Sequence, residues 1–207
     1  MGINKDKNSI YKTYDYHADA CPWVWVITGC MGSGKTELLL GLAEQDKKCG
    51  AKRQYFIKPD IDTRHVDCIA SRNGTSMFAN SFPIHMTGGE YLEYVDMFKK
   101  YDIDLVVIDE AQFFGEWIVD FVKELYEAGI NVYIAGLDKD AFGNPFGCMG
   151  ELMCIATEVS KLKGKCPMCD TPGTATISVK RNDNPDIISI GGDEKYTVRC
   201  WKHRKEI

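Results

Sequence analysis

The chain has 207 residues, of which 44% are hydrophobic, so it can bury one sizeable core but hardly two full-sized domains. Its formal net charge of -5 argues against a nucleic-acid-binding surface, which usually shows clustered excess Lys and Arg. No apolar run approaches the roughly 20 residues that a membrane helix needs, so we expect a cytoplasmic protein with a small-molecule partner and with neither nucleic acid nor membrane as a partner.

In chain order, a polar leader over residues 1–20 comes first; it has no periodic apolar pattern, and we expect it to be poorly ordered. Short apolar runs then predict β-strands at WVWVIT (23–28), RQYFIK (53–58), LVVI (105–108) and NVYIAG (131–136). Helical spacing fills the intervals, most clearly over 116–128, where apolar side chains form one stripe and Gly129 ends it. This alternation predicts an α/β fold, a parallel sheet with helices on both faces.

The character of the sequence changes near residue 164. A last helical pattern covers 150–163, and beyond it Cys, Gly, Pro and Thr dominate. We therefore expect an α/β domain over 21–163 and a small C-terminal domain over 164–207.

Directly after the first predicted strand, the stretch GCMGSGKT matches G-x-x-x-x-G-K-[ST] without a gap. Its glycines let backbone N–H groups turn toward a phosphate chain, Lys35 can reach the outer phosphates, and the Thr36 hydroxyl can hold Mg²⁺. The preceding strand and the helical run TELLLGLAEQ that follows are the context that such a loop requires. We therefore predict a P-loop NTPase-like fold whose nucleotide-binding residues are Gly29, Cys30, Met31, Gly32, Ser33, Gly34, Lys35 and Thr36.

The strand LVVI ends in two adjacent carboxylates, Asp109 and Glu110. An acidic residue at the end of a neighbouring strand is expected to hold Mg²⁺ together with the loop hydroxyl, so we assign Asp109 to the metal with Thr36. Glu110 is a candidate general base, acting either on water in an ATPase or on a substrate hydroxyl in a kinase. These residues alone leave hydrolysis and transfer both open.

The third motif is a pair of short knuckles, CPMC and, further along, CWKH. Two pairs of soft ligands, each with two residues between them, suit tetrahedral Zn²⁺. Four protein ligands leave no open coordination position, so the predicted site is structural. Its ligands are Cys166, Cys169, Cys200 and His203.

In combination, these motifs resemble those of the class II thymidine kinases, the cytosolic and bacterial type that also occurs in DNA viruses. The resemblance covers about residues 23–205. It rests on GCMGSGKTELL, IKPDIDTR (57–64), SRNG (71–74), VVIDEAQFF, GLDKDAFGNPFG (136–147), IGGDEKY (190–196) and the two knuckles. The phosphate loop alone is generic, whereas DEAQFF and IGGDEKY beside paired knuckles are specific together.

The resemblance implies that Glu110 takes the proton from the 5′-hydroxyl of thymidine while ATP delivers its γ-phosphoryl group, with Mg²⁺ and a structural Zn²⁺ as cofactors. Phe113 occupies the position whose ring packs on the thymine base, and the segment between the knuckles matches a lasso that covers the nucleoside. The other residues implied to bind substrate are Met31, Arg64, Leu137, Phe142, Ser178, Ile190, Gly191, Gly192 and Tyr196. The resemblance further implies deoxyuridine as a second substrate, a homotetramer, and feedback binding of thymidine triphosphate at the substrate site.

The chain departs from the family pattern at two of these positions. Ala141 stands where an aromatic ring is usual, so the adjacent Phe142 is the candidate for that contact, and Ser178 replaces the usual Thr. Two readings from other classes compete with the kinase: a P-loop ATPase with a zinc-ribbon module, which would turn over ATP without nucleoside, and a non-catalytic nucleotide-binding protein. The intact set of Lys35, Thr36, Asp109 and Glu110 disfavours the second.

Overall fold

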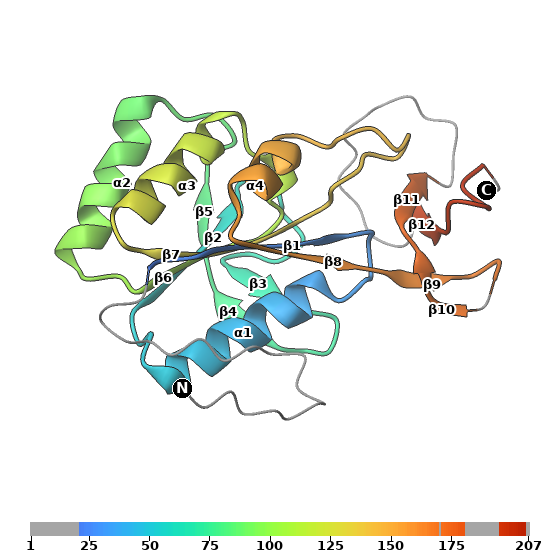
Figure 1. The fold of residues 1–207 in the computed structure, drawn as a ribbon, viewed down its shortest axis with the longest axis horizontal. Coiled ribbons are helices and arrows are strands. Elements are labelled where there is room, and N and C mark those ends of the chain that lie inside the picture. The colour runs from blue at the N-terminus through green and yellow to red at the C-terminus, as the bar shows by residue number, and fades with distance from the viewer. Residues whose placement is uncertain (1–20, 170, 181–194, 206–207) are drawn as a thin grey trace.

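A computed structural model describes residues 21–169, 171–180 and 195–205; the leader over 1–20 and most of the IGGDEKY segment lie outside these ranges. Within them the core is a six-stranded, entirely parallel sheet in the order β5-β2-β6-β7-β1-β8 (Figure 1). Its strands are β1 (Val24–Gly29), β2 (Gln54–Pro59), β5 (Asn80–Phe82), β6 (Leu105–Ile108), β7 (Asn131–Gly136) and β8 (Glu158–Leu162). The predicted parallel sheet is therefore confirmed.

Helices cover both faces of this sheet and create two apolar cores (Figure 1). One face carries α1 (Lys35–Cys49), and the other carries α2 (Gly88–Lys100), α3 (Trp117–Glu127) and α4 (Met149–Ile155). Successive side chains of a strand point to opposite faces: on β1, Val26 packs in the core with α2, α3 and α4, whereas Ile27 packs in the core with α1. Because both faces are buried, the central strands need apolar residues at nearly every position, which explains their continuous apolar runs.

The helical pattern predicted over 150–163 is wrong in its second half. There α4 ends at Ile155, and β8 follows as the outermost strand of the sheet beside β1. Thr157 directs the chain onto this edge, because its backbone N–H and its hydroxyl both donate to the carbonyl of Val24, at 2.8 and 2.9 Å. An edge strand has only one neighbour and needs no continuous apolar run, so its sequence was compatible with helical spacing.

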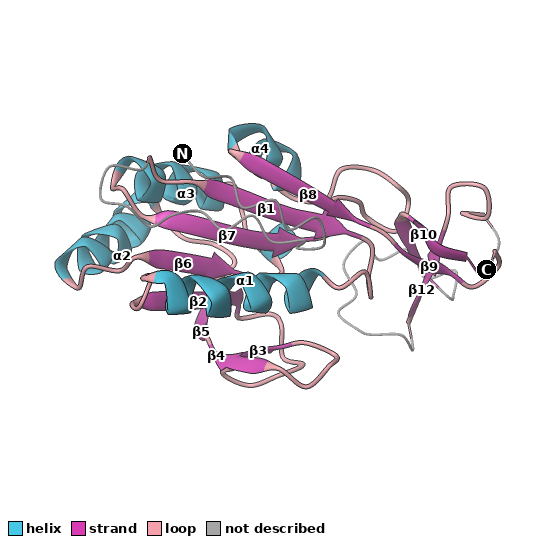
Figure 2. Ribbon diagram, turned by 60° about the horizontal axis from the view of Figure 1, so that its bottom comes forward, coloured by secondary structure: helices cyan, strands magenta, loops and turns pink. Residues whose placement is uncertain are grey.

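Two smaller parts stand outside the sheet (Figure 2). A hairpin of β3 (Cys68–Ala70) and β4 (Ser76–Phe78), which the sequence did not predict, stands off the sheet. The C-terminal tail lies where β1 and β8 end and contains two antiparallel pairs: β9 (Gly164–Cys166) with β10 (Thr171–Ala175), and β11 (Ile177–Lys180) with β12 (Tyr196–Arg199). In the described ranges, none of the helices is long and apolar enough to cross a lipid bilayer.

Candidate active site and metal centre

The predicted phosphate loop runs from the end of β1 into α1, and its glycines adopt conformations that other residues avoid. Gly29 has φ +143°, and a Cβ on it would lie 2.3 Å from the carbonyl oxygen of Leu162 in β8. Gly34 has φ +90° and precedes α1; among the described residues other than its chain neighbours, no atom lies within 4 Å of the position that a Cβ would take. The loop is therefore tightly packed on the β8 side and open on the side of the helix N-terminus, where a phosphate can approach backbone N–H groups.

Two side chains of this loop are placed for an anionic ligand. The Lys35 ammonium is buried and donates to the carbonyl oxygen of Cys30 at 3.0 Å, so it lies across the loop. Burial lowers its pKa, and the charges of Glu110 and Asp109 oppose that shift. The buried hydroxyl oxygen of Ser33 has no hydrogen-bond partner among the described residues. Such a group is costly to leave unpaired, and a phosphate oxygen is a suitable partner.

Asp109 directly follows β6, and its side chain contacts Thr36 in the first turn of α1. Its Oδ2 accepts a hydrogen bond from the Thr36 hydroxyl at 3.1 Å, and its Oδ1 accepts one from the backbone N–H of Glu110 at 2.9 Å. Burial, with the adjacent charge of Glu110, raises the pKa of Asp109 to about 7. A carboxylate and a hydroxyl side by side at a phosphate loop are the oxygen ligands that Mg²⁺ takes in such sites, so these residues fit the metal.

Glu110 leaves the strand in a left-handed conformation, with φ +53°, which is uncommon for a residue with a side chain. Its Oε1 lies 2.5 Å from Nη2 of Arg64, and its Oε2 lies 2.5 Å from Nε2 of Gln112. Arg64 is in turn paired with Asp62 through Nε and Oδ1 at 2.6 Å, and the Asp62 carboxylate lies 3.5 Å from the buried Lys58 ammonium. The candidate base is therefore fixed from both sides by donors on different segments.

Because Asp62 is buried and paired, its stability contribution is expected to depend on pH. Burial alone would raise its pKa, but Arg64 and Lys58 outweigh burial and hold the pKa below the ordinary value of 3.8. The stabilisation is then present above about pH 4 and is lost as the pH falls through the lower pKa of the folded state. Asp62→Asn should lower the free energy of unfolding by about 1.5–3 kcal/mol at pH 7. Denaturant unfolding should show this difference shrinking toward pH 3; an equal difference at both pH values would contradict the assignment.

One cavity of about 440 Å³ joins these groups to most of the other residues implied to bind substrate. Of the predicted site residues, those that line it are Met31, Gly32, Gly34, Lys35, Thr36, Arg64, Asp109, Glu110, Phe113, Leu137, Ser178 and Tyr196. Phe142 is 61% exposed and is not brought to the cavity, whereas its neighbour Ala141 lines it. Ile190, Gly191 and Gly192 lie outside the described residues.

Ser178 has a role in the structure that the sequence did not indicate. It lies on β11, is 4% exposed, and its hydroxyl accepts a hydrogen bond from the backbone N–H of Met31 at 2.8 Å. Nearby, the Cys30 thiol donates to the carbonyl oxygen of Ala175 at 3.4 Å. The C-terminal tail is therefore hydrogen-bonded directly to the phosphate loop.

Two residues that line the cavity, and one that lies behind it, were missed as individual site residues, although all three lie in the sequence blocks that carry the family resemblance. Phe146 lines the cavity and packs edge-on against Phe113, with ring centroids 5.7 Å apart. Arg72, in the turn of the β3–β4 hairpin, lies so close to the phosphate loop that a Cβ on Gly32 would be 3.0 Å from its Nη1. Gln112 contacts Glu110 from a buried position. Their blocks SRNG, DEAQFF and GLDKDAFGNPFG were the available signal.

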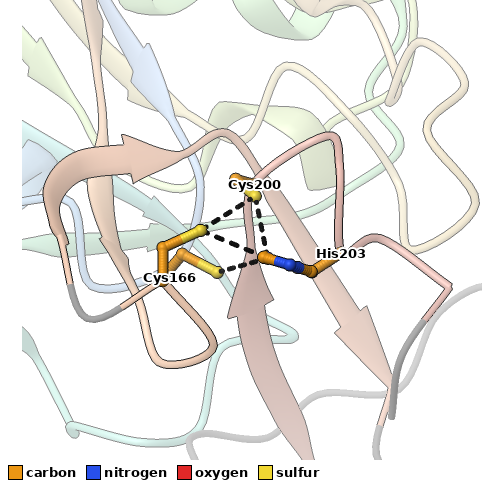
Figure 3. A group of neighbouring side chains, drawn as sticks. Cys166, Cys200 and His203 are labelled. Atoms are coloured by element: carbon orange, nitrogen blue, oxygen red, sulfur yellow. Dashed lines mark hydrogen bonds between the residues drawn. The ribbon is translucent and has the colours of Figure 1, made fainter.

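The two knuckles of the tail converge into one cluster (Figure 3). The three thiols and the His203 imidazole place their ligand atoms within 4.8 Å of one another, with His203 Nδ1 at 3.2 Å from Cys169 Sγ and 3.3 Å from Cys200 Sγ. Three soft sulfur donors and one imidazole suit Zn²⁺, and four protein ligands complete a tetrahedral shell. The predicted ligands Cys166, Cys169, Cys200 and His203 therefore form a cluster that fits structural zinc.

Comparisons with known proteins agree with this geometry. The family model described as thymidine kinase matches residues 22–204. The chain is 41% identical over 182 residues to a thymidine kinase of Mycoplasma genitalium, with 87% of this chain and 82% of that protein covered. It is 37% identical over 188 residues to a thymidine kinase of Coprothermobacter proteolyticus, with 88% and 90% covered. A solved structure of the replication initiator DnaA, bound to AMPPCP and single-stranded DNA, is 18% identical with a TM-score of 0.41 over 68% of this chain and 40% of that one, a likeness too low to carry an argument.

Proposed function

The chain belongs to the thymidine kinase family, and on this premise we propose how its residues transfer the γ-phosphoryl group of ATP to the 5′-hydroxyl of thymidine. Members of the family are ATP-dependent phosphotransferases, so this chain has that activity. The observation that carries the finer proposal is the position of Glu110: it stands in the same cavity as the Asp109–Thr36 pair and the phosphate loop.

Glu110 is the general base in this proposal. A carboxylate has about four lone-pair sites, so its hydrogen bonds to Arg64 and Gln112 leave room to accept the proton of the 5′-hydroxyl. Lys35 neutralises charge on the outer phosphates, and Thr36 with Asp109 would hold Mg²⁺. When bound, Mg²⁺ would supply charge neutralisation of the transferring group. The other requirement for transfer is that the base is held in position, and the contacts of Glu110 with Arg64 and Gln112 support this.

The thymine base is proposed to lie on Phe113, with Met31 and Leu137 as apolar walls. Ser178 and Tyr196 approach from the tail, and the backbone at Ile190, Gly191 and Gly192 is proposed to read the edge of the base. Since Phe142 is exposed, we assign the second aromatic contact to Phe146, whose ring already packs against Phe113. Arg64 is proposed to hold the carboxylate of Glu110 through their ion pair.

The zinc cluster is proposed to control closure of the segment between the knuckles. Ordering a long flexible segment over a substrate has an entropic cost, and fixing both of its ends removes part of that freedom. A closed segment excludes water, which would otherwise compete with the nucleoside for the phosphoryl group. Residues 21–163 would thus form the ATP-binding domain and 164–207 the nucleoside-covering domain.

Three further proposals rest on the family resemblance described above. They are a homotetrameric assembly, feedback inhibition by thymidine triphosphate at the substrate site, and a cytoplasmic location. Size-exclusion chromatography with light scattering would test the first, and inhibition kinetics with thymidine triphosphate would test the second.

Nucleoside selectivity tests the proposed base-binding site. Deoxyuridine, which lacks only the 5-methyl group, should be phosphorylated with a kcat/KM about tenfold below that of thymidine, because one methyl group in an apolar pocket has a small effect. Deoxycytidine should be at least about 10³-fold worse, because its exchanged donor and acceptor would leave buried polar groups unpaired. Monophosphate products should be quantified by chromatography at equal nucleoside concentrations. Equal use of deoxycytidine and thymidine would contradict the proposed site.

A further inference from the structure

Gln112 is a polar side chain in a place where the structure excludes water. It lies in the short 3₁₀-helix η1 (Ala111–Phe113) directly after the two carboxylates and is only 2% exposed. Its Nε2 donates to Oε2 of Glu110 at 2.5 Å, and its Oε1 accepts from the backbone N–H of Leu137 at 2.9 Å. One side chain thus connects the proposed base, beyond β6, with the proposed wall of the thymine pocket, beyond β7.

The chemistry of these partners fixes the amide in one orientation. A backbone N–H can only donate, so it requires the amide oxygen, and an ionised carboxylate can only accept, so it requires the amide nitrogen. Rotating the amide by half a turn would place donor against donor and acceptor against acceptor. A carboxylate at this position could satisfy Leu137 but would face Glu110 with a like charge.

The backbone around Gln112 is packed so closely that the side chain has little freedom. A Cβ on Gly136, the last residue of β7, would lie 2.8 Å from Oε1 of Gln112 and 2.6 Å from Sδ of Met149. A Cβ on Gly147 would lie 2.3 Å from the carbonyl oxygen of Gln112. Glycines at both positions therefore leave the space that Gln112 occupies. This close packing is independent support for a fixed position of Gln112.

We propose that Gln112 is a positioning residue that holds the carboxylate of Glu110 in its reactive orientation and couples it to the nucleoside pocket through Leu137. This inference rests on the proposed role of Glu110 as general base. Arg64 holds Oε1 and Gln112 holds Oε2, so the carboxylate is fixed by donors on two different segments. A base that must meet a hydroxyl at hydrogen-bond distance loses much of its effect when it is misplaced by about 1 Å.

The sharpest substitution is Gln112→Glu, which has nearly the same shape and keeps an oxygen for Leu137. It removes the donor to Glu110 and places a second carboxylate against it, so kcat for thymidine should fall about 10- to 100-fold. KM for ATP should stay within about twofold, because Gln112 does not line the cavity. Gln54→Glu is the matched control: Gln54 begins β2 and donates to the carbonyl oxygen of Ala43 at 2.6 Å, so this variant loses an amide donor but should keep kcat.

A mutant cycle with Glu110→Gln separates positioning from a general structural role. If Gln112 acts through Glu110, adding Gln112→Glu to the Glu110→Gln variant should leave the residual kcat within about twofold, because there is no base left to position. The double variant also restores an amide–carboxylate pair of reversed polarity, so its melting temperature should recover relative to Gln112→Glu alone. A melting temperature of Gln112→Glu well above the assay temperature shows that its fall in kcat is not unfolding.

Three outcomes are decisive. An unchanged kcat in folded Gln112→Glu protein would overturn the positioning role. The same 10- to 100-fold fall in the Glu110→Gln background would also overturn it, because Gln112 would then act independently of the base. Full activity of Glu110→Gln alone would instead reject the proposed base, and with it this inference.

Discussion

Replacing Glu110 with Gln is expected to lower kcat for thymidine by about 10²- to 10⁴-fold, the usual contribution of a positioned general base. Gln keeps the size of the side chain and can still accept a hydrogen bond from Arg64, but it cannot take the proton of the 5′-hydroxyl. Binding of Mg·ATP and of thymidine should change little, because the phosphate loop, Asp109 and Phe113 are unaltered. Steady-state formation of thymidine monophosphate measures kcat, and calorimetry measures binding.

A matched acidic residue outside the cavity controls for loss of charge. Glu116 precedes α3 and is not among the residues lining the cavity, so Glu116→Gln should retain wild-type kcat. If Glu110→Gln protein phosphorylated thymidine at the wild-type rate, the base would have to be another group. That result would remove the role on which the mechanism depends.

Removing a zinc ligand is expected to abolish thymidine turnover while ATP binding is retained. The apolar core of the tail is small: its buried members are Cys30, Cys166, Ala175 and Cys200, and one of these belongs to the phosphate loop. Metal binding therefore supplies much of the stability of the tail, because structural zinc contributes about 10–16 kcal/mol of apparent binding free energy in small domains. In Cys200→Ser protein the tail should lose its order and the nucleoside segment its anchor.

The control for this substitution is Cys154→Ser, which changes an exposed thiol on α4 outside the cluster. Zinc content by atomic spectroscopy should fall in Cys200→Ser protein and stay at the wild-type level in Cys154→Ser protein. Calorimetry with Mg·ATP and assays of thymidine monophosphate should then distinguish loss of the nucleoside site from loss of ATP binding. Full thymidine turnover in zinc-free Cys200→Ser protein would show that the cluster does not support the nucleoside site.

Much of the fold was predictable because its strongest signals are local. The central strands are continuous apolar runs because both faces of the parallel sheet are buried. The phosphate loop was recognisable from its residue spacing and from its place between a strand and a helix. The two knuckles indicated a metal site because the spacing within each knuckle is local, although only folding shows that they meet. These features need no knowledge of distant contacts.

Features that depend on distant contacts were not predictable in the same way. Residues 158–162 become a strand because Thr157 bonds to Val24, which is remote in sequence. The sequence indicated Phe142 as the aromatic contact and missed Phe146; only the path of the loop exposes the first and turns the second toward Phe113. Gln112 lies in the DEAQFF block, but the block does not indicate its role, which depends on hydrogen bonds to the Glu110 carboxylate and to the backbone N–H of Leu137.

The most direct test of the account is to count ADP and thymidine monophosphate in the same samples of the purified protein with Mg·ATP, with and without thymidine. The account predicts that ADP forms only when thymidine is present and that one monophosphate forms for each ADP, because the proposed base Glu110 would activate the nucleoside hydroxyl while the closed segment between the knuckles would exclude water. ADP formation that is indifferent to thymidine would contradict it, since Glu110 would then be acting on water.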